Sequence, residues 1–130
     1  MATIELGAAN FGDTVVADGI TIVDFWAAWC GPCVQFSPIF EKASETYTDI
    51  RFGKVDTEAE KQLAGEAGIT SIPTLMVFRD GILLFNQAGA LPGPALDELI
   101  QKVRDLDMDA IRKEIEAAGG ELGDVSEPQG

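Results

Sequence analysis

Histidine is absent from the chain, and cysteine occurs only twice among its 130 residues. Without an imidazole, the sequence excludes serine and cysteine triads that need a histidine base, and it excludes histidine-containing metal sites. Two thiols in one chain cannot build a four-thiolate zinc or iron–sulfur site. The residue types present therefore disfavour metal chemistry.

Basic residues are scarce: 9 lysines and arginines stand against 22 aspartates and glutamates, for a formal net charge of −13. This excess of negative charge argues against nucleic-acid backbones and anionic membrane surfaces as partners. The apolar stretches are only strand-sized, and the N-terminus lacks the basic and apolar segments of a signal peptide. Together with the low cysteine content, these features predict a soluble cytoplasmic protein without a disulfide scaffold.

Hydrophobic residues make up 46% of the chain, enough for the core of one domain. Strand-like and helical patterns follow in the order β-α-β-α-β-α-β-β-α, with strands expected at residues 3–6, 21–26, 50–56, 74–78 and 82–85. Helices between strands imply parallel crossovers, and Asp80-Gly81 marks an antiparallel hairpin. The expected fold is α/β, with a central mixed five-stranded sheet flanked by helices on both faces. The helices are expected near residues 10–17, 31–47, 57–67 and 94–106.

The C-terminal part of the chain differs in composition, because residues 105–130 carry eight acidic and two basic residues. A helical pattern at 109–118 predicts a short extra C-terminal helix. We therefore divide the chain into a main domain, an extra helix that packs on the domain or frays from it, and a disordered acidic tail, at residues 1–106, 107–118 and 119–130.

An acidic run that begins at Asp105 approximates the spacing of a calcium-binding loop. Its sixth position is Ala110, however, where the sharp turn of such a loop needs glycine, and no second loop pairs with it. The run is better explained as the start of a helix with a solvated face.

The most informative segment is Trp29-Cys30-Gly31-Pro32-Cys33, which lies between an apolar strand and a helix. In this position Cys30 is near the helix N-cap, where unpaired backbone N–H groups and the helix dipole favour a thiolate. A thiolate attacks disulfides, and Cys33, one turn into the helix, is close enough to attack the mixed disulfide that results. The two cysteines could instead be packing residues, but the strand–turn–helix context and the lack of other metal ligands favour redox chemistry.

Asp24 lies in the middle of the apolar strand that precedes the cysteines. Burial disfavours a charged carboxylate and raises its pKa. A buried acid that titrates near neutrality could take the proton of Cys33 during its attack. From the residues alone, this interpretation stands beside that of a structural aspartate satisfied by local hydrogen bonds.

From about residue 3 to residue 106, the chain resembles the thioredoxin family, with the WCGPC motif and a short acidic C-terminal extension. Besides that motif, the family pattern is present in Val23-Asp-Phe-Trp26, Pro38, Lys54-Val-Asp56, Ile72-Pro-Thr74 and Gly89-Ala-Leu91. These segments are scattered through the chain in the family's order and spacing, which makes the resemblance specific. The resemblance implies the thioredoxin fold and a thiol-disulfide oxidoreductase.

In detail, the resemblance implies a general protein-disulfide reductase of broad specificity. Cys30 would be the nucleophile, Cys33 the resolving thiol and Asp24 the proton acceptor, which Lys54 would tune. The redox pair would also be tuned by its neighbours Trp29, Gly31 and Pro32. An extended substrate segment would dock beside a cis Ile72–Pro73 bond, on a flat apolar patch that includes Trp29, Ile72, Pro73, Gly89 and Ala90.

The resemblance also implies the partners of the reaction. No cofactor is bound, since the two cysteines carry the electrons, and the oxidised pair would be recharged by thioredoxin reductase, an NADPH-dependent flavoprotein with FAD. The electrons would pass to oxidised proteins such as ribonucleotide reductase, peroxiredoxin and methionine sulfoxide reductase. We expect a cytoplasmic monomer that serves electron transport and cell redox homeostasis, without metal, nucleic acid or membrane.

Two alternatives remain. An oxidase or isomerase of the same fold is disfavoured by Gly31-Pro32, because the more oxidising relatives generally carry a histidine between their cysteines. A thioredoxin-fold binding module or holdase with incidental redox activity would keep its partners without the cysteines. Val34 occupies a position where many relatives carry a basic residue, which affects the charge around the site and the choice of partners.

Overall fold

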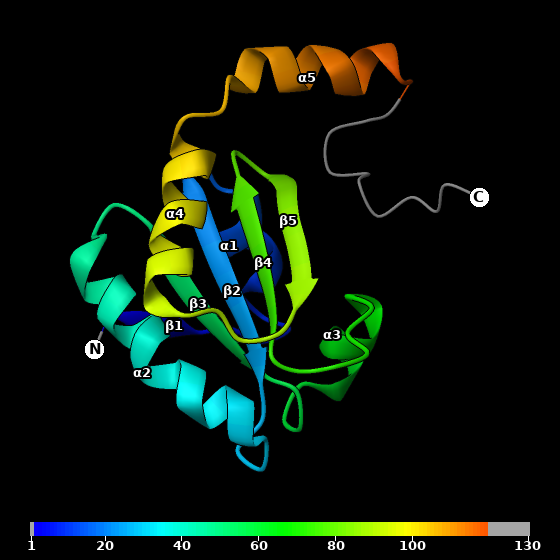
Figure 1. The fold of residues 1–130 in the computed structure, drawn as a ribbon. Helices are drawn as coiled ribbons and strands as arrows, with labels where there is room; N and C mark the ends of the chain where they lie inside the picture. The colour runs from blue at the N-terminus through cyan, green and yellow to red at the C-terminus, as the bar shows by residue number, and fades with distance from the viewer. Residues whose placement is uncertain (1, 120–130) are drawn as a thin grey trace.

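A five-stranded mixed sheet forms the centre of the computed structural model, which describes residues 2–119 (Figure 1). β1, β3 and β2 are mutually parallel, whereas β4 is antiparallel to both β2 and β5. The spatial order is β1 (Thr3–Glu5), β3 (Arg51–Asp56), β2 (Ile20–Trp26), β4 (Thr74–Arg79) and β5 (Ile82–Ala88). The mixed sheet expected from the sequence is confirmed. Within residues 2–119, no helix has the length and apolarity that crossing a membrane requires.

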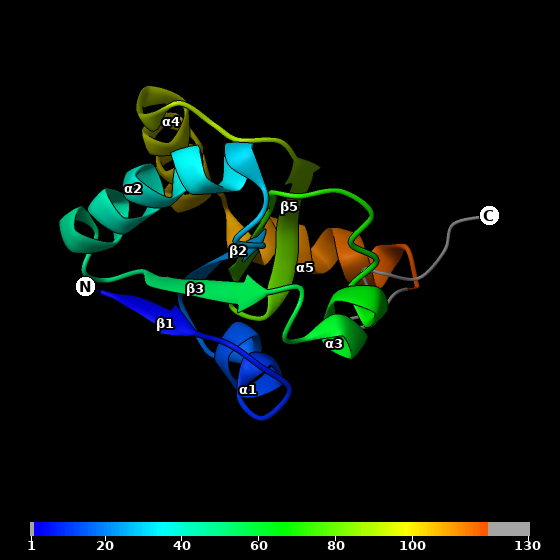
Figure 2. The ribbon, with the colours of Figure 1, turned by 90° about the horizontal axis from the view of Figure 1, so that it is seen from below.

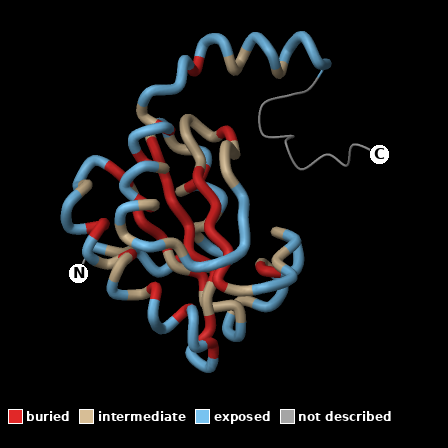
Figure 3. Tube along the Cα trace, viewed as in Figure 1, coloured by how far each residue is buried: buried red, intermediate tan, exposed pale blue. Residues whose placement is uncertain are grey.

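Helices cover both faces of this sheet, as Figure 2 shows. One face carries α2 (Gly31–Thr46) and α4 (Gly93–Arg104), and the other carries α1 (Phe11–Val16) and α3 (Lys61–Glu66). Side chains alternate along β2, so that Ile20 and Ile22 pack with α2 and α4, whereas Val23 and Phe25 pack on the opposite face. β2 is therefore buried from both sides, and the buried residues follow the central strands (Figure 3).

The connection through α3 differs from the expected parallel crossover. With six residues, α3 rises only about 9 Å, less than half the roughly 20 Å of a strand of the same length. After α3, residues 67–73 bring the chain to the end of the sheet where β2 stops, and Thr74 pairs with Phe25. As a consequence, β4 runs antiparallel to β2.

The helix expected at 57–67 is also shorter than predicted. Residues 57–59 form a turn instead of helix. The Asp56 carboxylate fixes this turn, because it accepts hydrogen bonds from the N–H groups of Glu58 and Ala59 at 2.9 and 3.3 Å. Side-chain bonds of this kind compete with helix formation.

β4 and β5 form the predicted hairpin. Asp80 and Gly81 have φ values of 55° and 83°. Two consecutive positive φ values are typical of a type I′ turn, whose twist matches that of the paired strands. The Asp80 carboxylate also accepts a hydrogen bond from the N–H of Gly19 at 2.8 Å.

The last described helix, α5 (Met108–Ala117), extends beyond the end of the sheet (Figure 1). Met108 is buried, and the Arg112 guanidinium pairs with the Asp80 carboxylate of the hairpin turn at 3.0 Å. The extra helix expected at 109–118 is thus present, beginning one residue earlier, and it contacts the domain. The division into segments remains a prediction, and all but the first residue of the tail expected at 119–130 lies outside the described residues.

Candidate redox site

The two cysteines lie where β2 leads into α2, and they form a disulfide. Cys30 is the N-cap residue of α2, and its Sγ accepts a hydrogen bond from the backbone N–H of Cys33 at 3.2 Å. Pro32 occupies the first turn, where a helix needs no N–H donor. After reduction, the same N–H group and the helix dipole favour a thiolate on Cys30.

The loop before β4 passes beside the disulfide. Its Ile72–Pro73 bond is cis, and the Ile72 carbonyl oxygen lies 3.7 Å from the Sγ of Cys30. Ile72 also packs against the buried cluster that contains the two cysteines. The structure thus brings this predicted substrate-binding loop to the predicted nucleophile.

Two exposed apolar side chains, here called the rim, directly adjoin the cysteines in the chain. Trp29 is 70% exposed and Val34 is 54% exposed. A hollow of about 580 Å³ lies beside the indole and is lined by both Trp29 and Ile72. Gly89 and Ala90 are exposed, and the N–H of Gly89 donates to the Pro73 carbonyl at 2.8 Å, which links their loop to the site.

Glu58 holds the indole of Trp29 in place. Its Oε2 accepts a hydrogen bond from the indole Nε1 of Trp29 at 3.1 Å. We did not single out this residue from the sequence. It lies 29 positions from its partner, and nothing in the local pattern of the acidic turn distinguishes it from its neighbours.

Asp24 lies in the middle of β2, with an exposed fraction of 0%. Neither carboxylate oxygen has a hydrogen-bond partner among residues 2–119. Burial raises the pKa of Asp24 to about 7, against the opposing attraction of the Lys54 ammonium. Local hydrogen bonds therefore do not satisfy this aspartate, and it changes protonation state near neutral pH.

Lys54 is the strand partner of Asp24 across β2 and β3. Its ammonium is directed to α2, where Nζ donates to the Ser37 hydroxyl at 3.0 Å and lies 3.8 Å from the Glu41 carboxylate. It also lies 4.8 Å from the centre of the Trp26 ring. Ser37 and Glu41 were missed from the sequence, where their spacing of four residues on a helix is too common to be a signal.

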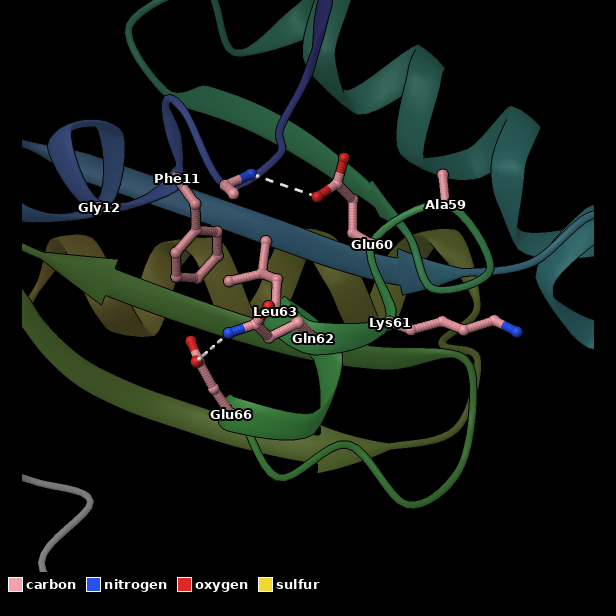
Figure 4. Close-up of a pocket in the computed structure, with 9 residues that line it drawn as sticks. Phe11, Gly12, Ala59, Glu60, Lys61, Gln62, Leu63 and Glu66 are labelled. Atoms are coloured by element: carbon pink, nitrogen blue, oxygen red, sulfur yellow. Dashed lines mark hydrogen bonds between the residues drawn. The ribbon is translucent and has the colours of Figure 1, made fainter.

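A second hollow, of about 530 Å³, lies between α1 and α3 (Figure 4). Three of its polar side chains are engaged: Glu60 accepts a hydrogen bond from the N–H of Ala8 at 3.3 Å, and Gln62 donates to Glu66 at 3.2 Å. None of the predicted site residues lines this hollow. This hollow is therefore separate from the predicted redox site.

The acidic run that approximates a calcium loop begins α5 instead. Asp107 is the N-cap residue of this helix, and its carboxylate accepts a hydrogen bond from the N–H of Ala110 at 3.1 Å. In the part of the chain that the structure describes, no three cysteine, aspartate or glutamate side chains are grouped so that they could hold a metal ion.

Known proteins share this sequence pattern and fold. The thioredoxin family model matches residues 2–104. Putative thioredoxin 2 of Streptomyces coelicolor is 49% identical over 122 residues, which cover 94% of this chain and 91% of that protein. The thioredoxin of Bacillus subtilis is 38% identical over 103 residues, which cover 78% of this chain and 98% of that protein.

Among solved structures, that of Plasmodium falciparum thioredoxin matches with a TM-score of 0.70 and 36% identity, covering 77% of this chain and 98% of that one. Proteins of this family are thiol-disulfide oxidoreductases whose redox group is a disulfide of their own, without a bound cofactor. Here that group is the Cys30–Cys33 disulfide. The chain belongs to the thioredoxin family.

Proposed function

We propose that this protein is a general protein-disulfide reductase. Dithiol–disulfide exchange is the chemistry of the family, and the proposal concerns its direction and range. The observation that carries it is the disulfide at the N-cap of α2, next to an exposed apolar rim. The exposed apolar side chains of Trp29 and Val34 select weakly among partners, which suits many different protein disulfides.

The reaction begins when the Cys30 thiolate attacks a substrate disulfide. A bond forms between Cys30 and one substrate sulfur, and the other substrate sulfur leaves as a thiolate that takes up a proton. The Cys33 thiol then transfers its proton to the Asp24 carboxylate and attacks Cys30 Sγ. The Cys30–Cys33 disulfide forms, the second substrate sulfur leaves as a thiolate that takes up a proton, and two electrons have passed to the substrate.

Several neighbours would support these steps. Gly31 and Pro32 keep the two cysteines three residues apart at a helix N-terminus, and the exposed Trp29 directly precedes them. The extended backbone of a substrate would pair beside Ile72, against the surface that includes Gly89 and Ala90. Pro73 is buried and would shape this loop rather than expose a contact of its own.

Thioredoxin reductase and disulfide-containing proteins are the partner classes of the family. We propose that an NADPH-dependent flavoprotein of that kind recharges this chain in the cytoplasm, where the chain acts as a monomer. Substrates such as ribonucleotide reductase, peroxiredoxin and methionine sulfoxide reductase remain proposals, as do the roles in electron transport and redox homeostasis.

The equilibrium potential of the Cys30–Cys33 pair tests this function. Titration against glutathione or dithiothreitol buffers can be followed by the fluorescence of Trp26 and Trp29. A value near −270 mV, about that of other thioredoxins, would support a reductase. A value of about −180 mV or above would contradict it and indicate disulfide formation or isomerisation.

A variant with both cysteines replaced by serine addresses the remaining alternative. If the protein is a reductase, Cys30→Ser/Cys33→Ser loses all reduction of protein disulfides. If the variant instead keeps its partners and its biological role, the redox pair is incidental and the protein is a binding module or holdase.

A further inference from the structure

Strand pairing places Lys54 beside Asp24. The Lys54 ammonium is nevertheless directed to α2, away from the Asp24 carboxylate. Lys54 and Asp24 are partners in a parallel strand pair, so both side chains point to the face of the sheet that α2 covers. Among the described residues, the lysine forms its ion pair with Glu41 and its hydrogen bond with Ser37, and it forms no ion pair with Asp24.

Ser37 and Glu41 can act together because they are four residues apart on α2 and so share one helix face. One carboxylate oxygen of Glu41 faces Lys54, and the other, Oε1, is buried without a hydrogen-bond partner among residues 2–119. The side chains of Lys54 and Glu41 are 15% and 22% exposed. With so little water around them, the charges interact more strongly than an ion pair on the open surface.

We propose that Glu41 is a positioning residue for the proton step at Asp24. Together with Ser37, it holds the Lys54 ammonium against α2 and so limits how strongly that ammonium stabilises an ionised Asp24. The carboxyl thereby keeps the affinity for a proton that it needs in order to take one from the resolving thiol. This inference rests on the proposed role of Asp24 as proton acceptor.

The other groups around this pair provide a matched control. A hollow of about 330 Å³ beside Lys54 is lined by Glu41 and also by Glu5, the β1 partner of Lys54. Glu5 makes no ion pair with the ammonium in the described part of the chain. On the other side of Asp24, the β4 partner is the apolar Leu75. Besides Glu41, the charged side chains of α2 are Lys42 and Glu45, which are both exposed, and the two active-site cysteines lie at the start of the helix. Glu5→Gln and Glu41→Gln thus remove equal charge from one hollow, but only the second removes a contact with the lysine.

Removing the charge of Glu41 should lower the pKa of Asp24. Glutamine keeps the size of the side chain but no longer attracts the ammonium, which can then approach Asp24 and stabilise its ionised form. Bringing a unit charge from roughly 10 Å to roughly 5 Å, in a medium of effective dielectric about 20, shifts a pKa by about one unit. We expect a fall of about one pH unit in Glu41→Gln, a much smaller one in Glu5→Gln, and a value near that of the wild type in Glu41→Asp, which keeps the charge.

The experiment is a carbon-13 NMR titration of the aspartate carboxyls in the full-length reduced protein. The Asp24 signal is followed in the wild type and in the three variants, and the pH profile of substrate reduction is measured in parallel. A fall in Glu41→Gln that is absent from Glu5→Gln, accompanied by a matching displacement of the profile, supports the inference. Equal shifts in the two glutamine variants, no shift, or a rise would overturn it.

A separate variant distinguishes this inference from the function on which it rests. If Asp24→Asn reduces substrates as fast as the wild type across neutral pH, the proton-acceptor role fails, whatever the titration shows. If Asp24→Asn is slow but Glu41→Gln leaves the Asp24 titration unmoved, the proton-acceptor role stands and the positioning role of Glu41 is wrong.

Discussion

Replacing Asp24 by asparagine should stabilise the folded protein at neutral and alkaline pH. Asparagine keeps the size of the side chain but cannot ionise. In the wild type, burial raises the pKa of Asp24 to about 7, whereas an aspartate in an unfolded chain titrates near 3.9, about its value in water. Between these two values, the unfolded chain has released a proton that the folded protein still binds, so that wild-type stability falls as the pH rises.

The separation of the two pKa values sets the size of the effect. It amounts to about three pH units, which corresponds to about 4 kcal/mol. The stability of the wild type is unaffected by this group below about pH 4, decreases between about pH 4 and about pH 7, and is constant above that interval. The free energy of unfolding of Asp24→Asn, relative to the wild type, should therefore grow by about 4 kcal/mol across the interval and then level off.

Urea unfolding of the two oxidised proteins, followed by tryptophan fluorescence from about pH 4 to about pH 9, measures this difference. Groups that titrate alike in both proteins cancel when the two curves are subtracted. A difference that stays constant over the whole range would refute the reasoning, because it would mean that the Asp24 carboxyl titrates in the folded protein as it does in the unfolded chain.

Three further predictions concern other parts of the molecule. Cys33→Ser should accumulate a mixed disulfide between Cys30 and a protein substrate, visible by mass spectrometry, whereas Cys30→Ser should form none if Cys30 is the nucleophile. Val34→Lys should speed the reduction of negatively charged disulfides at low salt, because the added positive charge attracts them, and leave the reduction of a neutral disulfide unaffected. Equal changes in rate for the two substrates would mean that charge on the rim does not steer partners. Arg112→Ala should destabilise the protein by no more than about 1 kcal/mol and speed amide exchange in α5. Replacing the neighbouring exposed lysine, in Lys113→Ala, should do neither. Equal exchange in both variants would mean that the ion pair does not anchor the helix.

The features that were predicted from the sequence depend on local chemistry. Two cysteines at the start of a helix indicate a redox pair wherever that helix packs. Asp80-Gly81 specifies a turn through backbone conformations that few residues adopt. The burial of Asp24 followed from the continuous apolar run around it, because such a strand has to be covered on both faces.

The features that were missed depend on contacts between distant segments. The direction of β4 depends on where the whole connection, residues 57–73, returns the chain to the sheet, and the sequence indicated a helix there but overestimated its length. The position of the Lys54 ammonium is set by Ser37 and Glu41, which meet it only because α2 packs across the sheet. Pairing of this kind leaves no periodic signal, since each residue type is common at helix surfaces and only the tertiary fold brings the three together.

Asp24 can ionise at the centre of this fold because the buried apolar core supplies enough stability to offset the cost. Ionising Asp24 at neutral pH costs about 4 kcal/mol of stability, from the separation of its two pKa values. A fully buried large apolar side chain contributes about 1.5–3 kcal/mol, and Phe25, Phe36, Phe40 and Phe52 are all fully buried in the clusters that enclose the sheet. The size of the core is therefore part of the proposed chemistry: a smaller core could not hold an unpartnered base of near-neutral pKa beneath the helix that carries the cysteines.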